Sequence, residues 1–480
     1  MKTKKIGFLF SLLAFFYICT VTRPVIAETL LEQVTQNNYN IPETDLPETG
    51  IVIEAENGQI FWEQDATKSI DAAELSNLMT IYLTLEAIQQ GELSLDKKVI
   101  ATQNDEAIGQ IQLLNNNNII AGIEYTVRDL LKLAVVPSSN VATLMLANLL
   151  EEQDGRFVTQ MNNKAAELGM TQTTFNTATG IPAVQFNGYY QPEGYDIDAG
   201  NLTTAKDLAI LIYHLIREFP SILDTTKELS FTVLPDSLYE ETFETDNDSL
   251  YSRPFAFKGT DGLKTSQSTT GFNAIMTAKQ NGLRVITVLT GIGDVLRPES
   301  KQALFPISNT LMEQVFDNYE YKEIISAGQQ ELHKQTIQVE NDWYAVIKKG
   351  EQPTFTLKDN QLTLTEALPI ISDSVAPLTA SYREVTLPVE KNIEQHTFLA
   401  KIVNVVEITK LTILALGIAL LGLIFLLMSF FIPIVPDKKR KNTHQKRSRI
   451  SLLPTKKIIR WVGIGFCLIG FSILFIQYIL

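Results

Sequence analysis

Cysteine is almost absent from this sequence, and the two residues present lie near its ends. Cys19 and Cys467 both fall in apolar segments of the 480-residue chain. Many secreted domains depend on disulfides, so an exported part of this chain must rely on its hydrophobic core, and the chain is long enough to build one. An exported region without cysteine is typical of proteins from bacteria that export proteins without oxidative folding.

Histidines and glycine-rich loops are also scarce, which removes several kinds of chemistry. The histidines occur singly, without the spacing of metal ligands, and His214 fits a surface or hydrogen-bonded core residue. No glycine-rich phosphate loop is present. The sequence therefore predicts neither a metal nor a cofactor. The four histidines are His214, His333, His396 and His444.

The N-terminal residues 1–27 resemble an export signal. Lysines at the start precede the apolar run "IGFLFSLLAFFYICTV", and Val25–Ala27 offers a cleavage site with small residues. The alternative is an uncleaved membrane anchor, but the apolar run is short for a span. Export of the following residues is the prediction.

Two long apolar runs near the C-terminus predict transmembrane helices, at 411–435 and 461–480. The segment 436–460 between them carries ten Lys and Arg and one acid, Asp437. A basic run can bind nucleic acid, but between two spans it indicates a cytoplasmic loop. This topology places the main domains outside the cell membrane, in agreement with the signal. The rest of the chain carries all of the net negative charge, which argues against anionic polymers as partners.

The exported region reads as two domains, because its length exceeds one ordinary core. In 45–318, strand-like runs flank several helical patterns, and the Asn57-Gly58 and Asn281-Gly282 pairs indicate hairpins. This order predicts a mixed α/β (α+β) domain closed by pairing its first and last strands. A linker, 28–44, precedes it. An all-β module, 319–390, and a juxtamembrane segment, 391–410, follow.

Several ordered stretches resemble the D-alanyl-D-alanine carboxypeptidases, the low-molecular-weight penicillin-binding proteins. They include "IEAENGQIFWEQD", "LMTIYLTLEAIQQGELSLDKKV", "YTVRDLLKLAVVPSSN", "FVTQMNNKAAELGMTQTTFNTATG" and "DGLKTS", and they cover more than half of the chain. The resemblance implies a penicillin-recognising serine-hydrolase fold, with an antiparallel sheet flanked by helices and a β-rich stalk domain. It also implies the peptidoglycan stem peptide as substrate.

That family uses three motifs, S-x-x-K, S-x-N and K-T-G, which supply a serine nucleophile, its lysine base and groups that hold the substrate. By resemblance, Ser138 and Asn140 match the second motif. Lys264 and Thr265 match the third, in which Ser266 replaces the usual glycine. The first motif is degenerate: Glu74 stands at the nucleophile position and Asn77 at the base position.

No other serine restores the first motif. Ser76 lies roughly 200° around the helix from Glu74, and Ser94 of "SLDK" falls in the loop after that helix. Since an asparagine amide has no titratable amine, Asn77 cannot act as the base. The asparagine run 115–118 is expected to be a loop tip outside the site.

Relative to the family, the Ser→Glu exchange adds a negative charge and the Lys→Asn exchange removes a positive one, so the net charge of the site falls by two. One hypothesis is that Glu74 pairs with Lys264 and fills the position of the substrate carboxylate, which would repel stem peptides. The alternative is that Glu74 projects into water.

Three functions remain open. The first is a membrane-anchored pseudoenzyme, a scaffold or regulator that contacts cell-wall synthesis proteins. The second is an active hydrolase in which Glu74 acts as general base for water. The third is a module that binds stem peptides or β-lactams without turnover.

Overall fold

The chain forms two separate structural units, Met1–Val385 and Thr386–Leu480. The predicted signal peptide 1–27, the juxtamembrane segment 391–410 and most of the basic loop 436–460 lie outside the described residues. The computed structural model describes residues 28–332, 335–372, 374–375, 378–385, 414–428 and 456–479.

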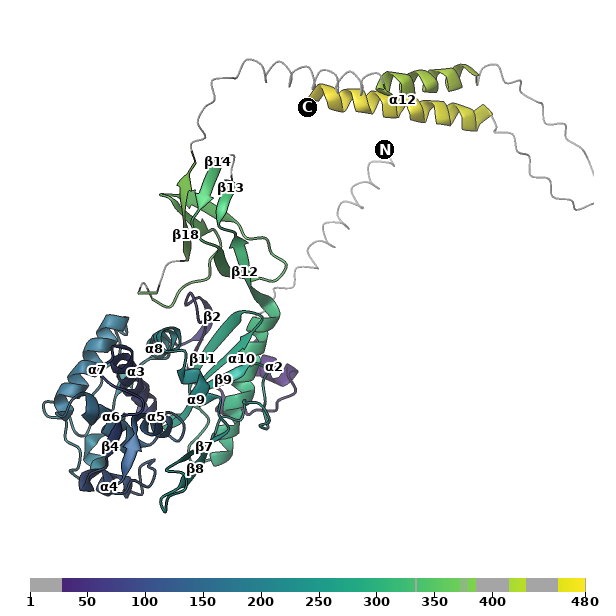
Figure 1. Ribbon diagram of the computed structural model, residues 1–480. Coiled ribbons are helices and arrows are strands. Elements are labelled where there is room, and N and C mark those ends of the chain that lie inside the picture. Colours follow the sequence, from purple (N-terminus) through teal and green to yellow (C-terminus); the bar gives the residue numbers. More distant parts are fainter. Residues whose placement is uncertain are drawn as a thin grey trace, which may run out of the picture. The chain divides into compact units, whose positions relative to one another are not determined.

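An antiparallel five-stranded sheet forms the centre of the first unit (Figure 1). The first strand pairs with the last one, with Ile51 opposite Val288 and Ile53 opposite Ile286, so the predicted closure of the domain is confirmed. In spatial order the strands are β2 (Ile60–Gln64), β1 (Thr49–Glu54), β11 (Leu283–Ile292), β10 (Gly271–Gln280) and β9 (Thr260–Ser268).

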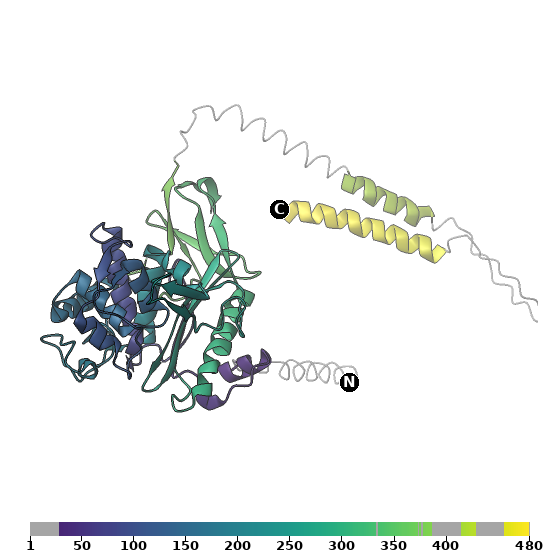
Figure 2. The ribbon, with the colours of Figure 1, turned by 60° about the horizontal axis from the view of Figure 1, so that its bottom comes forward.

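Both faces of this sheet are buried, because successive strand side chains point to opposite sides. Ile51 and Ile53 belong to the core beneath the helical lobe, whereas Val52 between them packs toward α10 (Leu304–Asn318). Helix α2 (Leu30–Gln36) packs on α10, and Figure 2 shows the two together. The segment 28–44, predicted as a linker, therefore contains a helix, which begins with a capping box at Thr29.

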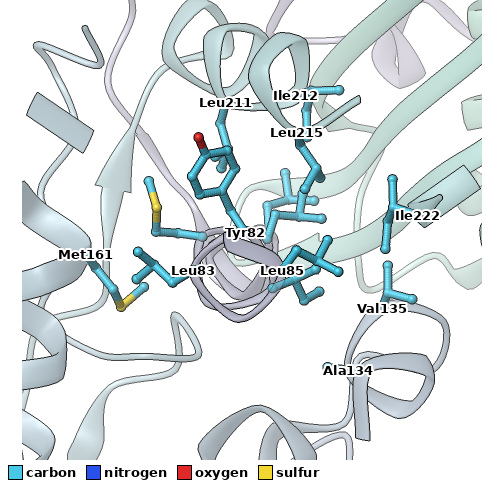
Figure 3. Close-up of a cluster of buried hydrophobic side chains, with 14 of the residues drawn as sticks. Tyr82, Leu83, Leu85, Ala134, Val135, Met161, Leu211, Ile212, Leu215 and Ile222 are labelled. Atoms are coloured by element: carbon cyan, nitrogen blue, oxygen red, sulfur yellow. The ribbon is translucent and has the colours of Figure 1, made fainter. Parts of the chain in front are cut away.

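Helix α3 (Asn77–Gln89) runs through the middle of the helical lobe and is buried nearly all round. Figure 3 shows Tyr82, Leu83 and Leu85 surrounded by apolar side chains from four other helices. The sequence predicts one apolar face for α3, but its polar positions Thr80 and Thr84 are buried as well. These hydroxyls donate to the carbonyls of Ala178 and Thr80, which meets the cost of their burial.

The lobe is completed by six further helices and three two-stranded pairs. The helices are α4 (Gln103–Gly109), α5 (Val127–Val135), α6 (Asn140–Leu150), α7 (Asp154–Leu168), α8 (Ala205–Glu218) and α9 (Ile222–Thr226). The paired strands are β3 (Ile70–Asp71) with β6 (Leu202–Thr203), β4 (Lys98–Ile100) with β5 (Glu124–Thr126), and β7 (Ser230–Val233) with β8 (Glu241–Glu244). The short 3-10 helices are η1 (Glu43–Asp45), η2 (Ala73–Ser76), η3 (Ala183–Phe186) and η4 (Pro298–Ala303).

A small β domain follows α10 and has its own apolar core around Ile337, Trp343 and Leu362. It is attached to the first domain along the hairpin of β1 and β2, where the Ile60 amide donates to the Pro369 carbonyl at 2.7 Å. Its strands are β12 (Tyr319–Ile325), β13 (Gly328–Leu332), β14 (Gln335–Val339), β15 (Trp343–Lys348), β16 (Phe355–Lys358), β17 (Gln361–Leu364) and β18 (Thr379–Glu384).

The second unit contains a helix at 414–428 and helix α12 (Lys456–Ile479). The two helices touch, since the Phe425 and Phe466 rings stack with their centroids 6.2 Å apart. Over the described residues, no helix combines the length and the hydropathy required for a membrane span. The transmembrane helices expected at 411–435 and 461–480 stay predictions.

Candidate functional site

Glu74 lies in the short 3-10 helix η2 that leads into α3, and its side chain is only 7% exposed. The entry to this turn is fixed by the Asp71 carboxylate, which accepts a hydrogen bond from the Ala73 amide at 2.9 Å. Gly180 packs so closely on Ala73 that a Cβ there would lie 1.7 Å from the Ala73 carbonyl oxygen. The alternative that Glu74 projects into water is therefore wrong.

The Glu74 carboxylate is held by two asparagine amides. Asn115 Nδ2 donates to both carboxylate oxygens, at 2.7 and 2.9 Å, and Asn140 Nδ2 lies 3.5 Å from Oε1. The same Asn140 nitrogen donates to the Asn115 backbone carbonyl at 3.0 Å. Burial raises the pKa of Glu74, while the Lys264 charge and the amide hydrogen bonds oppose this rise.

The asparagine run 115–118 is part of the site and is not a loop tip, which corrects the sequence-based expectation. Besides the contact of Asn115 with Glu74, Asn116 Oδ1 accepts from the Val141 amide at 3.0 Å. Asn117 Oδ1 accepts from the Ser139 hydroxyl at 2.6 Å. Because an amide side chain both donates and accepts, this run ties its loop to the start of α6. The run of four asparagines is visible in the sequence, but its contacts with Glu74 and with α6 are not.

Asn77, at the family's base position, has a structural contact. It is the first residue of α3 and is 2% exposed, and its Nδ2 donates to the Ala134 carbonyl at 2.9 Å. Carbonyls in the last turn of a helix lack partners within that helix. Asn77 thus satisfies the C-terminal end of α5 and links it to α3.

Lys264 extends from the edge strand β9 to the same helix end. Its Nζ donates to the carbonyls of Ala134 and Val135, at 3.4 and 3.2 Å, and to Ser138 Oγ at 2.5 Å. The side chain is 3% exposed. Burial lowers the pKa of Lys264 to about 8, while the charges of Glu74 and Asp246 oppose the shift. An ammonium group has three N–H bonds, and here each of them has an acceptor.

Glu74 and Lys264 do not form the direct ion pair that we hypothesised. Over the described part of the chain, no nitrogen–oxygen contact within 4.0 Å joins these two residues. Each takes separate partners, Glu74 from the asparagine amides and Lys264 from α5 and Ser138. The two charges still attract each other at longer range, since each opposes the pKa shift that burial causes in the other group.

The remaining motif residues also bond to protein groups. Ser138 is 5% exposed and adopts a left-handed backbone conformation, with φ of 60°. Thr265 Oγ1 lies 3.4 Å from an Asp246 carboxylate oxygen. Ser266, in place of the family's glycine, accepts a hydrogen bond from Asn273 Nδ2 of the neighbouring strand at 3.2 Å.

Neither serine considered as a substitute nucleophile reaches the site. Ser76 is 1% exposed, and its Oγ packs against Gly180, where an added Cβ would lie 2.7 Å from it. Ser94 is exposed in the turn after α3, where its Oγ accepts from the Asp96 amide at 3.3 Å. Both structural results agree with the predictions.

A hollow of about 580 Å³ lies beside the motif residues. Ala73, Gly180 and the end of β9 at Gln267–Thr269 line it, but Glu74, Ser138 and Lys264 do not. This hollow therefore does not reach those three side chains. No cluster of three His, Cys, Asp or Glu that suits a metal occurs in the portion of the chain that the structure covers.

Residues 38–293 match the family model described as D-alanyl-D-alanine carboxypeptidase. The chain belongs to this family. The match covers more than half of the chain, and it confirms the resemblance inferred from the sequence motifs. A second model, DUF1958, a domain of unknown function, matches residues 321–383 in the β domain.

Curated relatives and solved structures agree with this membership. The D-alanyl-D-alanine carboxypeptidase DacF of Bacillus subtilis is 23% identical over 366 residues, which cover 74% of this chain and 81% of the relative. DacC of Escherichia coli is 28% identical over 244 residues, 50% of this chain and 55% of the relative.

Among solved structures, the peptidoglycan synthesis regulatory factor (PBP3) from Streptococcus pneumoniae has a TM-score of 0.60 at 24% identity. The alignment covers 71% of this chain and 99% of that one. Penicillin binding protein 5 from Haemophilus influenzae has a TM-score of 0.56 at 20% identity, over 72% of this chain and 98% of that one. These two structures establish the shared fold.

Proposed function

We propose that this chain is a catalytically inactive member of the carboxypeptidase family that acts as a scaffold or regulator in peptidoglycan metabolism. One observation supports this most strongly: the Glu74 carboxylate occupies the nucleophile position and is held there by Asn115 and Asn140. A carboxylate is a poor nucleophile toward amides, and an acyl anhydride would be an unstable intermediate. The serine acylation route therefore has no starting group.

The base is missing as well as the nucleophile. Asn77 has no amine, and its amide nitrogen is engaged by the Ala134 carbonyl. Lys264 donates toward Ser138, and with a pKa of about 8 it is mainly an ammonium group at neutral pH. In that form Lys264 has no lone pair with which to take the proton of Ser138, so this pair does not replace the lost one.

The proposal includes anchoring at the cell membrane, with the main domains outside and the basic loop in the cytoplasm. Support comes from the sequence: the leader 1–27, the apolar runs 411–435 and 461–480, and the lysine- and arginine-rich segment between those runs. Cell-wall synthesis proteins are the proposed partners, and the stem peptide is a weak or lost ligand.

An altered hydrolase is the second candidate, and the raised pKa of Glu74 favours it, because general bases work best with a pKa near the working pH. Against it stand the amide contacts, which direct both carboxylate oxygens toward asparagine nitrogens. Binding of stem peptides or β-lactams without turnover is the third candidate, and the hollow beside Ala73 favours it.

The test is release of D-alanine from diacetyl-L-lysyl-D-alanyl-D-alanine by the full chain in detergent, measured from pH 5 to 9. We expect no release above the protein-free rate at any pH. Release that follows one titration and disappears in Glu74→Gln would instead establish the altered hydrolase. Saturable thermal protection by the same tripeptide, without release, would establish the binding module.

A further inference from the structure

A second recess lies at the junction of the two domains of the first unit, far along the sheet from β9. It consists of a hollow of about 420 Å³ and an adjoining one of about 170 Å³. Tyr319, Lys348 and Glu351 line both hollows, and we call the two adjoining hollows together the junction recess. The larger hollow falls within the roughly 300–1,000 Å³ that small-molecule sites occupy.

An irregularity in the edge strand directs two aromatic rings into this recess. The pairing of β1 with β2 shifts between Val52 and Ile53, so that Ile60 faces Ile53 and Trp62 faces Val52, leaving Phe61 as the extra residue. Such a β-bulge re-aims side chains at sheet edges. Both Phe61 and Trp62 consequently line the recess and pack against the core on the α10 side.

The rings are held in place by their surroundings. Trp62 lies over Gly50, where an added Cβ would be 2.8 Å from Trp62 Cζ3, so the glycine provides the space for the indole. The Phe61 and Tyr319 rings meet at 4.9 Å between centroids. Trp62 and Tyr319 are only half-buried, so each keeps accessible surface at the recess. A fixed, partly exposed aromatic wall is the result.

Polar groups of both signs surround this wall. Gln314 and Asn318 of α10 contribute amides, which donate and accept. Lys348 and Glu351 lie 3.9 Å apart, and their side chains are 57% and 59% exposed. Because neighbouring charges of opposite sign cancel, the recess favours a neutral ligand rich in hydrogen-bonding groups over a charged polymer.

We propose that the junction recess binds a β-linked N-acetylhexosamine chain. The C–H faces of a pyranose ring match the electron-rich faces of Trp62 and Tyr319. Its hydroxyl and acetamido groups match the amides of Gln314 and Asn318. Two adjoining hollows suit a chain of sugars better than a single compact ligand. This choice of sugar rests on the proposed function, which places the domain at the cell wall.

The test is binding of chitotetraose to the full chain in detergent, followed by isothermal titration calorimetry and tryptophan fluorescence. We expect saturable binding, and Trp62→Ala should weaken it about two- to tenfold, since the variant removes the aromatic face on which a sugar ring would stack. Tyr344→Ala is the matched control, because this exposed tyrosine of β15 does not line the recess.

A second variant tests the same site in case Trp62→Ala does not fold. Lys348 and Glu351 are exposed, so Lys348→Ala/Glu351→Ala should keep the melting temperature and still weaken chitotetraose binding. No binding of chitotetraose, equal binding of maltotetraose, or a proline-rich peptide bound at Trp62 in its place would overturn the proposal. The Glu74→Ser/Asn77→Lys variant should bind chitotetraose as the wild type does, so this proposal and the proposed function fail separately.

Discussion

The motif site and the junction recess differ in how far their side chains are buried. The motif site comprises Glu74, Asn77 and Lys264, which are between 2% and 7% exposed, and each of these side chains makes at least one hydrogen bond to a neighbouring protein group. At the junction recess, half-buried aromatic rings and exposed polar groups surround open volume. A family's reactive position can thus be converted into internal structure while open space persists elsewhere in the same chain.

Replacing one lysine in each region should give the largest difference in the free energy of unfolding. Lys264→Met is expected to lower the free energy of unfolding by about 3–5 kcal/mol, because three acceptors and the nearby Glu74 charge lose a buried cation. Lys348→Met, at the exposed rim of the recess, should change it by less than about 0.5 kcal/mol. Urea unfolding of both variants provides the measurement. Equal effects would mean that the motif site is not a structural element.

The pH dependence of stability should report on a second buried glutamate, Glu54 at the end of β1 near the junction. Burial raises the pKa of Glu54 to about 7 from its ordinary value of 4.5. Between these two values the unfolded chain is ionised at this residue while the folded chain is protonated. Stability therefore falls as pH rises from 4.5 to 7 and levels off above it.

Glu54→Gln should remove this loss. We expect the variant to be more stable than the wild type at pH 8 by on the order of 3–3.5 kcal/mol, from 1.36 kcal/mol per pKa unit between 4.5 and about 7, and to match it near pH 4. Unfolding curves in urea at pH 4, 6 and 8 measure the difference. A wild-type profile that is flat over this range would contradict the assignment.

A smaller effect should follow from removing the link between α3 and α5. Asn77→Ala deletes the hydrogen bond to the Ala134 carbonyl and should cost about 1–2 kcal/mol, since it leaves a buried acceptor with one donor fewer. Asn318→Ala, on the exposed end of α10, is the matched control and should stay near zero. A stabilised Asn77→Ala variant would show that this asparagine is not a structural contact.

The sequence predicts the framework better than the contacts. Asn57-Gly58 predicts the first hairpin, and the apolar spacing from Leu75 predicts α3, because turn chemistry and periodicity are local properties. The motifs also locate the substituted positions. The role of Asn115 escapes prediction, since its partner Glu74 lies 41 residues away. The bulge at Phe61 escapes it too, because a register shift depends on the partner strand.

The most direct test of the central claim is covalent labelling by a fluorescent penicillin, applied to the full chain and to its Glu74→Ser/Asn77→Lys variant. If these two substitutions removed the chemistry while the family fold stayed intact, only the variant is labelled. Labelling of the natural chain would show that another nucleophile works at the motif site, and it would contradict the account of Glu74 as the residue that ends acyl transfer.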